Sequence, residues 1–224
     1  MILGIIQARM SSSRFPGKVL KPLFGIPMLQ VMAIRALDSR KIDLIMIATS
    51  SDKIDNPIRE LCRKNRFHCY SGAHFDVLDR FYWASQVFWP DHIVRLTGDC
   101  PLIDSEIVDQ VIDMHISGKF DYTRNMGFAD GLDVEVMTFE ALCKAWSDAG
   151  TKYEREHVTP YFYNHPEIFK IGELRNEIDQ SKMKISIDTE EDYLKIKRFL
   201  EIILWEEEKS EGRIQLKTKM QTPD

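Results

Sequence analysis

The chain opens on an apolar run, Ile2-Leu-Gly-Ile-Ile6, that leads directly into the segment Gln7-Ala-Arg-Met-Ser-Ser-Ser-Arg-Phe-Pro-Gly-Lys18. The run has the length and the branched residues of a buried strand, and the small polar residues after it indicate a turn at its carboxyl end. Open α/β sheets bind their ligands at that edge. These opening residues therefore predict an α/β fold and the position of its ligand.

The loop after this strand has the composition of an anion-binding site. It combines alanine, three serines, three cations and a Pro-Gly pair: Ala8, Ser11, Ser12, Ser13, Arg9, Arg14, Lys18, Pro16 and Gly17. Free backbone N–H groups and positive charges in a tight bend suit a nucleoside triphosphate. The loop has neither the Walker A spacing nor the G-x-G-x-x-G fingerprint. The alternative is a basic surface turn whose charges are solvated.

Length and composition favour one ordinary globular domain. The chain has 224 residues, of which 44% are hydrophobic, and a formal charge of −5. The negative charge disfavours a nucleic-acid surface, and we expect no membrane partner and a cytoplasmic location because no apolar stretch is long enough to span a bilayer. The four cysteines show no metal-ligand spacing. We expect the domain to cover residues 1–207 and a polar, disordered tail to cover residues 208–224.

Hydrophobic periodicity predicts strands that alternate with amphipathic helices. The expected strands are 2–6, 43–49, 68–70, 92–97, 120–123, 134–138, 168–172 and 183–187, and the expected helices are 27–37, 56–64, 76–88, 104–116, 153–164 and 189 to about 207. The first seven elements read β-α-β-α-β-α-β, which favours a mainly parallel, right-handed, doubly wound sheet. The predicted fold is thus a Rossmann-like three-layer α/β sandwich with a mainly parallel mixed sheet.

Two aspartates follow predicted strands at the ligand-binding edge. Asp99 comes after the strand that ends at Thr97, with Gly98 between them, and Asp188 comes after Ile187 at a helix start. Magnesium bound to a triphosphate is typically held by one or two such carboxylates. The alternatives are that Asp188 is only a helix N-cap and that Asp99 is only a turn residue.

Six blocks, taken together in order, resemble the signatures of the CMP-sugar synthetases, which are cytidylyltransferases, and most of all the branch that contains spore coat polysaccharide biosynthesis protein F. The blocks are Ala8 to Lys18, Gly72 to Phe81, Gly98-Asp-Cys-Pro101, Asp130-Gly-Leu-Asp-Val-Glu135, Arg155-Glu-His-Val-Thr-Pro160 and Ile187-Asp-Thr-Glu-Glu-Asp192. They extend over residues 2 to about 200. The resemblance implies a nucleotide-diphospho-sugar transferase fold in a single domain.

The resemblance also implies roles for individual residues. The nucleotide CTP would be held by Ala8, Arg9, Ser11, Ser12, Ser13, Arg14, Gly17, Lys18, Asp76, Asp79, Arg80, Gly98 and Asp99. Mg²⁺ would be held by Asp99 and Asp188, which together with Arg9 and Lys18 would form the catalytic set. The sugar would be faced by Asp133, Glu135, Glu156 and His157. From the residues alone, Asp133 and Glu135 also fit the wet face of a strand, and His157 fits a structural histidine.

The implied reaction is attack of a sugar hydroxyl on the α-phosphorus of CTP, with pyrophosphate as leaving group and a CMP-sugar as product. Catalysis would be chiefly positioning and electrostatics. An acidic sugar is the expected acceptor, in surface or spore coat polysaccharide biosynthesis. The alternatives are a glycosyltransferase of the same general fold, although its usual Asp-x-Asp is absent from the sequence, and a non-catalytic nucleotide-binding relative.

The family resemblance implies a homodimer formed through residues 120–166. The aromatic residues Tyr161, Phe162 and Tyr163 would supply contacts to the second copy unless they belong to the core.

Overall fold

A computed structural model describes residues 1–211, and its centre is a seven-stranded mixed sheet. The strand order is β5-β4-β1-β6-β8-β7-β9. Only β8 runs antiparallel to its neighbours, β6 and β7. The strands are β1 (Ile2–Gln7), β4 (Leu44–Ser50), β5 (His68–Gly72), β6 (His92–Thr97), β7 (Tyr122–Met126), β8 (Glu135–Thr138) and β9 (Ile171–Arg175). This arrangement confirms the predicted α/β fold with a mainly parallel mixed sheet.

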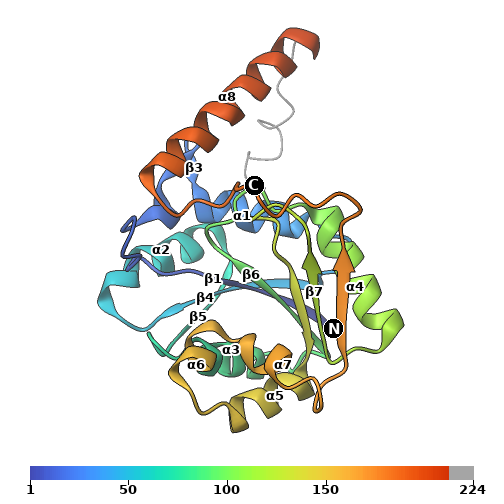
Figure 1. The fold of residues 1–224 in the computed structure, drawn as a ribbon. Helices are drawn as coiled ribbons and strands as arrows, with labels where there is room; N and C mark the ends of the chain where they lie inside the picture. Colours follow the sequence, from blue (N-terminus) through green and yellow to red (C-terminus); the bar gives the residue numbers. More distant parts are fainter. Residues whose placement is uncertain (212–224) are drawn as a thin grey trace.

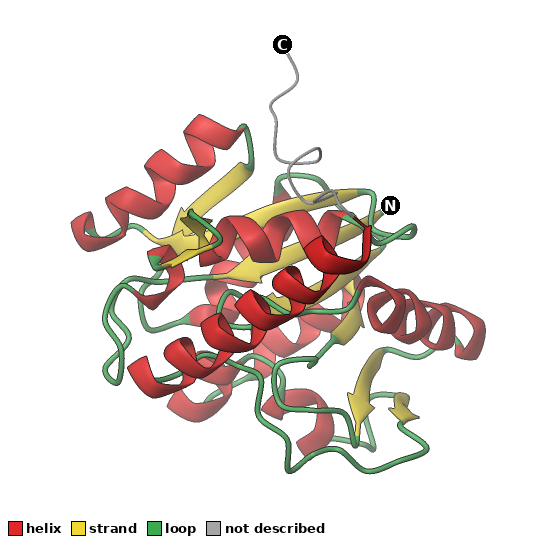
Figure 2. Cartoon of the chain, turned by 90° about the horizontal axis from the view of Figure 1, so that it is seen from above, coloured by secondary structure: helices red, strands yellow, loops and turns green. Residues whose placement is uncertain are grey.

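Helices cover both faces of the sheet and make it the middle of three layers (Figures 1 and 2). One core cluster joins the sheet to α1 (Met28–Leu37), α2 (Asn56–Asn65), α4 (Ser105–Gly118) and the start of α8 (Glu190–Glu211). The other cluster joins it to α3 (Val77–Gln86), α5 (Phe139–Asp148) and α7 (Pro160–Asn164), and α6 (Lys152–His157) lies on this same side. Helix α8 projects away from the body of the domain (Figure 1).

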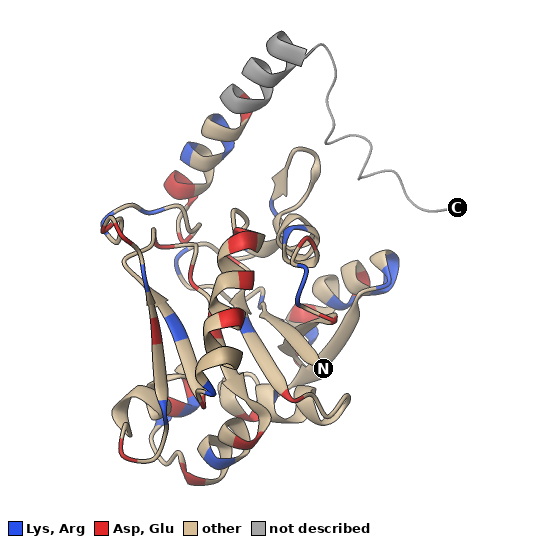
Figure 3. Cartoon of the chain, turned by 90° about the vertical axis from the view of Figure 1, so that its right-hand side faces the viewer, with Lys and Arg blue, Asp and Glu red and all other residues tan. Residues whose placement is uncertain are grey.

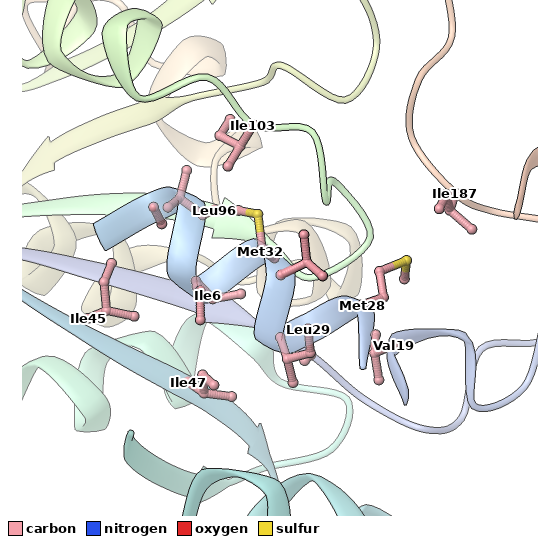
Figure 4. Packing of buried hydrophobic residues seen from close by; sticks show 14 of the residues in the cluster. Ile6, Val19, Met28, Leu29, Met32, Ile45, Ile47, Leu96, Ile103 and Ile187 are labelled. Carbon is pink, nitrogen blue, oxygen red and sulfur yellow. The ribbon is translucent and has the colours of Figure 1, made fainter. Parts of the chain in front are cut away.

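The core under α1 fixes the elements that carry the first loop. Leu29 and Met32 of α1 are fully buried against Ile6 of β1 and Leu96 of β6 (Figure 4). Ile187 is also fully buried in this cluster. Burial of such a side chain stabilises the fold by roughly 1.5–3 kcal/mol. The segment before α8 is therefore anchored to the same core as β1 and β6.

Short elements follow the first loop. The 3₁₀ helix η1 (Lys18–Leu20) comes first, and then a hairpin of β2 (Pro22–Leu23) and β3 (Ile26–Pro27). Its two turn residues, Phe24 and Gly25, have φ values of 53° and 82°, the left-handed pair of a type I′ turn. A second 3₁₀ helix, η2 (Lys53–Asp55), precedes α2.

Two sequence-based expectations for the second half of the chain were wrong, and one helix was not predicted. The expected strand 183–187 is not a strand, because its backbone bonds to the Asp130 turn and to the carbonyl of Asp99 instead of forming a ladder. The expected helix 153–164 breaks into α6 and α7 at Val158, whose φ is 70°. Helix α5 was not predicted, although Thr138 caps it by accepting a hydrogen bond from the Ala141 N–H at 3.1 Å.

The observed bounds of two other elements, a strand and the last helix, also differ from the expected ones. Strand β9 begins at Ile171 and continues to Arg175, whereas the expected strand was 168–172. Helix α8 continues to Glu211 instead of ending near residue 207. The rest of the expected tail, residues 212–224, lies outside the described part of the chain.

A pair of histidines away from the ligand-binding edge predicts a pH dependence of stability. His115 is fully buried, with one ring nitrogen 3.2 Å from His92 and the other 2.9 Å from the Thr123 hydroxyl. Burial, and then the neighbouring His92, lower the pKa of His115 from 6.5 to about 4. Below pH 6.5 the unfolded chain thus binds a proton that the folded chain binds only near pH 4.

Stability should accordingly be complete above pH 6.5 and decrease as the pH falls towards 4. We expect His115 to cost roughly 2–3 kcal/mol of unfolding free energy between pH 7 and pH 4.5. Urea unfolding at pH 7 and at pH 4.5 measures this difference in unfolding free energy. In His115→Gln this part of the pH dependence should disappear, whereas His165→Gln, which changes a half-buried histidine paired with Glu167, should retain it. Equal pH dependence in wild type and His115→Gln would contradict the assignment.

Candidate nucleotide and acceptor site

The first loop is held in a fixed shape by its own backbone and by a buried aspartate. The N–H of Gly17 donates to the carbonyl of Met10 at 2.9 Å, and Gly17 has a left-handed φ of 73°, which a side chain would strain. The N–H of Met10 donates to Asp55 at 2.7 Å. Burial raises the pKa of Asp55, but hydrogen bonds from Ser50 and Met10 outweigh it and lower the pKa. An ionised Asp55 therefore anchors the loop.

Three residues far apart in sequence meet at the carboxyl edge of the sheet. The Lys18 ammonium donates to Asp99 at 2.6 Å and to Asp188 at 3.1 Å. Lys18 is 7% exposed, so this cation is almost removed from water. The Asp188 carboxylate also pairs with Arg14 at 2.8 Å and with Lys184 at 3.2 Å. The two candidate metal ligands thus face one cation from two sides.

Asp188 is not the cap of the following helix. Thr189 and Asp192 cap α8 reciprocally, since the Thr189 hydroxyl accepts from the Asp192 N–H at 3.2 Å and Asp192 accepts from the Thr189 N–H at 2.9 Å. Partial burial raises the pKa of Asp188, but its bonds to Lys18 and then Lys184 outweigh that effect and lower the pKa. Its carboxylate is therefore ionised and directed to the basic loop.

Gly98 brings Asp99 close to the first strand. The N–H of Gly98 donates to the carbonyl of Gln7 at 2.9 Å. A Cβ at this position would lie 3.0 Å from that carbonyl oxygen and 3.1 Å from the Cβ of Ala8. Only glycine fits this contact without a shift of β1 or β6, and this explains the Gly98-Asp99 pair.

A pocket of about 240 Å³ opens between the first loop, α3, α6 and the Asp188 segment. Its ionisable lining consists of four cations, three carboxylates and one histidine: Arg9, Arg14, Lys18, Arg80, Asp99, Glu156, Asp188 and His157. Ala8, Ser12, Ser13 and Gly98 complete the predicted residues on its wall. Gln7, Val19, Val77 and Thr97 also line it, although they were not among the predicted site residues.

Arg80 is the most unusual of these cations. It is 2% exposed, its Nη1 donates to the carbonyl of Ala73 at 2.8 Å, and its Nε has no hydrogen-bond partner. Burial, followed by the nearby Arg9, lowers the pKa of Arg80 to about 10. Two guanidinium groups close together at a pocket wall favour binding of an anion between them.

Four predicted nucleotide-binding residues lie outside this pocket. The Ser11 hydroxyl bonds to His74 at 3.2 Å, and Gly17 forms the loop's bend. Asp76 caps α3 and pairs with Arg155 at 2.7 Å, and Asp79 accepts from the Trp146 indole at 2.9 Å. In the structure these four residues stabilise the loop and the helices around the pocket.

A second pocket of about 440 Å³ adjoins the first and shares four residues with it: Thr97, Asp99, His157 and Asp188. Of the predicted sugar-facing residues, Asp133, Glu135 and His157 line it, whereas Glu156 lines only the first pocket, where it lies 3.9 Å from Arg9. Two ligands, one bound in each pocket, would therefore lie next to each other at the four shared residues.

Glu135 belongs to a charged network in the wall of the second pocket. It pairs with Arg95 and accepts a hydrogen bond from the Tyr122 hydroxyl. Burial, together with Glu135, raises the pKa of Tyr122. Arg124 pairs with Glu173 at 2.7 Å and lies over the Tyr163 ring at 5.1 Å. Arg95 and Arg124 were not predicted as site residues, although a charge inside the apolar β6 segment was a usable signal for Arg95.

Unpaired polar atoms mark the same two pockets. Among the described residues, five buried side-chain polar atoms have no hydrogen-bond partner, and four of them belong to Gln7, Arg80, Arg95 and Ser186. All four residues line one of the two pockets. Because buried polar groups are almost always paired, this concentration indicates a place where a ligand supplies the missing partners.

Comparison with known proteins decides the family. A cytidylyltransferase family model matches residues 3–217. The chain belongs to the cytidylyltransferase family. Over 203 residues it is 36% identical to spore coat polysaccharide biosynthesis protein SpsF of Bacillus subtilis, and the match covers 88% of this chain and 85% of SpsF. As a member of this family, the protein is a nucleotidyltransferase.

Solved structures agree with the family. A cytidylyltransferase of Leptospira borgpetersenii superposes with a TM-score of 0.83 at 38% identity, over 88% of this chain and 84% of that one. The CMP:2-keto-3-deoxy-manno-octonic acid synthetase complexed with CTP superposes with a TM-score of 0.69 at 16% identity, over 91% of this chain and 99% of that one, so the two share the fold.

Two features, a membrane-spanning helix and a preformed metal-binding cluster, are not found in the part of the chain that the structure describes, residues 1–211. No helix in this part is long and apolar enough to cross a bilayer. Among the side chains that the structure describes, no group of three or more His, Cys, Asp or Glu is placed to hold a metal ion by itself. Basic and acidic residues are spread over the coloured part of the ribbon, which includes the start of α8 (Figure 3).

Proposed function

We propose that the protein transfers the cytidylyl group of CTP to an acidic sugar, giving a CMP-sugar and pyrophosphate. The observation that carries the proposal is the meeting of Lys18, Asp99 and Asp188 between two adjoining pockets. In this assignment the first pocket holds the triphosphate of CTP and the second holds the sugar. The CMP:2-keto-3-deoxy-manno-octonic acid synthetase solved in complex with CTP has the same fold and supports this choice.

The phosphates are matched by the charges of the first pocket. Arg9, Lys18 and Arg80 lie along its wall, and Arg80 has both an unpaired Nε and a neighbouring like charge. A triphosphate between them supplies the missing acceptor and relieves the repulsion. Serines 12 and 13 add hydroxyl and backbone donors at the same wall.

The carboxylates fit Mg²⁺ as the cofactor. Asp99 and Asp188 already converge on one cation, the Lys18 ammonium, at 2.6 and 3.1 Å. Two carboxylates suit a magnesium ion whose remaining ligands are phosphate oxygens and water. When bound, the metal would neutralise phosphate charge and polarise the reacting phosphoryl group. Asp99 and Asp188 would hold it, and Lys18 would then be available to the phosphates.

The protein's own part in the reaction is positioning. The shared residues of the two pockets place a sugar hydroxyl beside the α-phosphorus for in-line attack. Arg9 and Lys18 stabilise the charge that accumulates on the phosphates as pyrophosphate leaves.

An acidic group on the sugar is supported by the arginines of the second pocket. The Arg124 side chain is 28% exposed and is paired with Glu173, whose side chain is 27% exposed. A sugar carboxylate can replace Glu173 in this ion pair without leaving a buried charge unpaired. Asp133 and Asp130 remain as acceptors for sugar hydroxyls.

The cellular setting follows from the relative. We propose that the reaction takes place in the cytoplasm and supplies activated sugar for surface or spore coat polysaccharide. The relative SpsF, a spore coat polysaccharide biosynthesis protein, supports the polysaccharide part of this proposal. A homodimer through residues 120–166 stays a prediction. Tyr161 and Phe162 are 6% and 0% exposed and belong to the core, so they are not available as its aromatic contacts.

Pyrophosphate release tests the proposal. Each of the four nucleoside triphosphates is mixed with Mg²⁺, the protein and either 3-deoxy-manno-octulosonate or N-acetylneuraminate. We expect release with CTP and at least one of these sugars, and none without sugar. A glycosyltransferase would instead consume a nucleotide sugar, and a non-catalytic relative would show a CTP-dependent rise of melting temperature without pyrophosphate.

A further inference from the structure

Among the described residues, His157 is the only histidine that lines both pockets. Of the four shared residues, Asp99 and Asp188 are bound to Lys18, and the Thr97 hydroxyl lies 2.9 Å from the Cys100 sulfur. His157 is exposed and has a ring contact with Tyr153 at 4.6 Å. An exposed side chain that lines both pockets is accessible to a ligand bound there.

The backbone after His157 is held in a rare conformation. The Thr159 N–H donates to the carbonyl of His157 at 2.8 Å, around a Val158 with φ 70° and ψ −60°. These values define a classic γ-turn, which is strained, and more so for a β-branched residue. Val158 is fully buried, so the core maintains this turn. Strain that persists beside a pocket is typical of a functional residue whose position matters.

We propose that His157 is the general base that takes the proton from the attacking hydroxyl of the acceptor. This inference rests on the proposed function. The neutral imidazole accepts the hydroxyl proton, the hydroxyl oxygen forms a bond to the α-phosphorus, and the bond from that phosphorus to the bridging oxygen breaks. The bond's electron pair leaves on pyrophosphate, and the imidazolium releases its proton to solvent.

The surroundings suit this role. The charged and titratable groups that line a pocket with His157 are Arg9, Arg14, Lys18, Arg80, Arg95, Arg124, Asp99, Asp130, Asp133, Glu135, Glu156, Asp188, Cys100, Tyr153 and Tyr163. Asp99 and Asp188 are bound to Lys18, Glu135 is paired with Arg95, and Asp133 accepts a hydrogen bond from the Gly131 N–H at 3.0 Å. The guanidinium and ammonium groups cannot accept a proton at neutral pH. Asp130 and Glu156 each line only one of the two pockets, whereas His157 lines both. Imidazole is the side chain that changes protonation in the range where such an enzyme operates.

The test compares His157→Gln and His157→Ala with wild type and with His165→Gln. His165 is a matched control, because it pairs with Glu167 at 3.0 Å and lies outside both pockets. Turnover is measured at saturating CTP and Mg²⁺ across pH 5.5–8.5, with the acidic sugar on which wild type releases pyrophosphate. We expect kcat of both His157 variants to fall on the order of 10²–10⁴-fold.

Three further readouts separate a base from a structural residue. The acidic limb of the pH profile should disappear in His157→Gln, free imidazole should restore part of the turnover of His157→Ala, and the melting-temperature rise on CTP–Mg²⁺ should equal that of wild type. If the His157 variants retained wild-type kcat and the acidic limb of the pH profile, the assignment of His157 as the general base would be overturned, while the proposed function would stand. Wild type that binds CTP but releases no pyrophosphate with either sugar would overturn the proposed function and this assignment with it.

Discussion

Asp188→Asn should lose most of its turnover, on the order of 10³-fold or more, while CTP binding without metal changes little. The amide keeps the shape of the side chain but not the anionic charge that would hold Mg²⁺ beside Lys18 and Asp99. Asp99→Asn should lose a similar factor. The double variant should be hardly slower than either single one, since residues that act as a unit are not additive. Steady-state pyrophosphate release measures all three.

Stability supplies the control for this prediction. Thr189 and Asp192 cap α8, so Asp188→Asn does not remove a cap, and its melting temperature should fall by only a few degrees through the lost ion pairs. Glu190→Gln is the matched variant, because it removes one exposed negative charge at the same helix start. It should retain full turnover. Full turnover in Asp188→Asn would remove that residue from the metal site.

Lys18→Met should abolish most of the rise in melting temperature that CTP–Mg²⁺ produces, together with turnover. Lys18 is the most buried cation of the first loop and contacts both carboxylates. Without it, the phosphates lose a cation and the two carboxylates repel each other, so the ligand-free protein should also melt a few degrees lower. Calorimetric titration with CTP in the presence of Mg²⁺ measures the affinity.

Lys21→Met is the matched control, since Lys21 is an exposed cation three residues further on that lies over Phe15 at 5.4 Å. It should bind CTP as wild type does. Equal CTP affinity of Lys18→Met and wild type would show that this lysine does not contact the nucleotide.

The sequence predicted the first half of the fold well because each element there is local. The run Ile2 to Ile6 is apolar on both faces, and the helices that follow alternate with similar strands. The second half depends on contacts that periodicity does not show. Residues 183–187 resemble a strand, yet they pair with the Asp130 turn because Gly131 allows a close approach, where a Cβ would lie 2.6 Å from the Ser186 nitrogen.

Residue types identified the charged members of the site but not their partners. Lys18, Asp99 and Asp188 carry recognisable signals, a loop cation and carboxylates after strands. The buried state of Arg80 and the pairing of Arg95 with Glu135 depend on packing between distant elements. Asp76 and Asp79 were assigned to the nucleotide by motif position alone, and in the structure they bind Arg155 and Trp146. Their contact with the nucleotide stays a prediction.

Transfer of label from CTP to a sugar distinguishes a CMP-sugar synthetase from the alternatives in one measurement. The protein, Mg²⁺ and an acidic sugar are incubated with CTP that carries ¹⁸O at the non-bridging oxygens of its α-phosphate, and the products are separated and identified by mass spectrometry. We expect the label in a CMP-sugar and none in the released pyrophosphate. Label found only in free CMP, or in no product while a nucleotide sugar is consumed instead, would contradict this expectation.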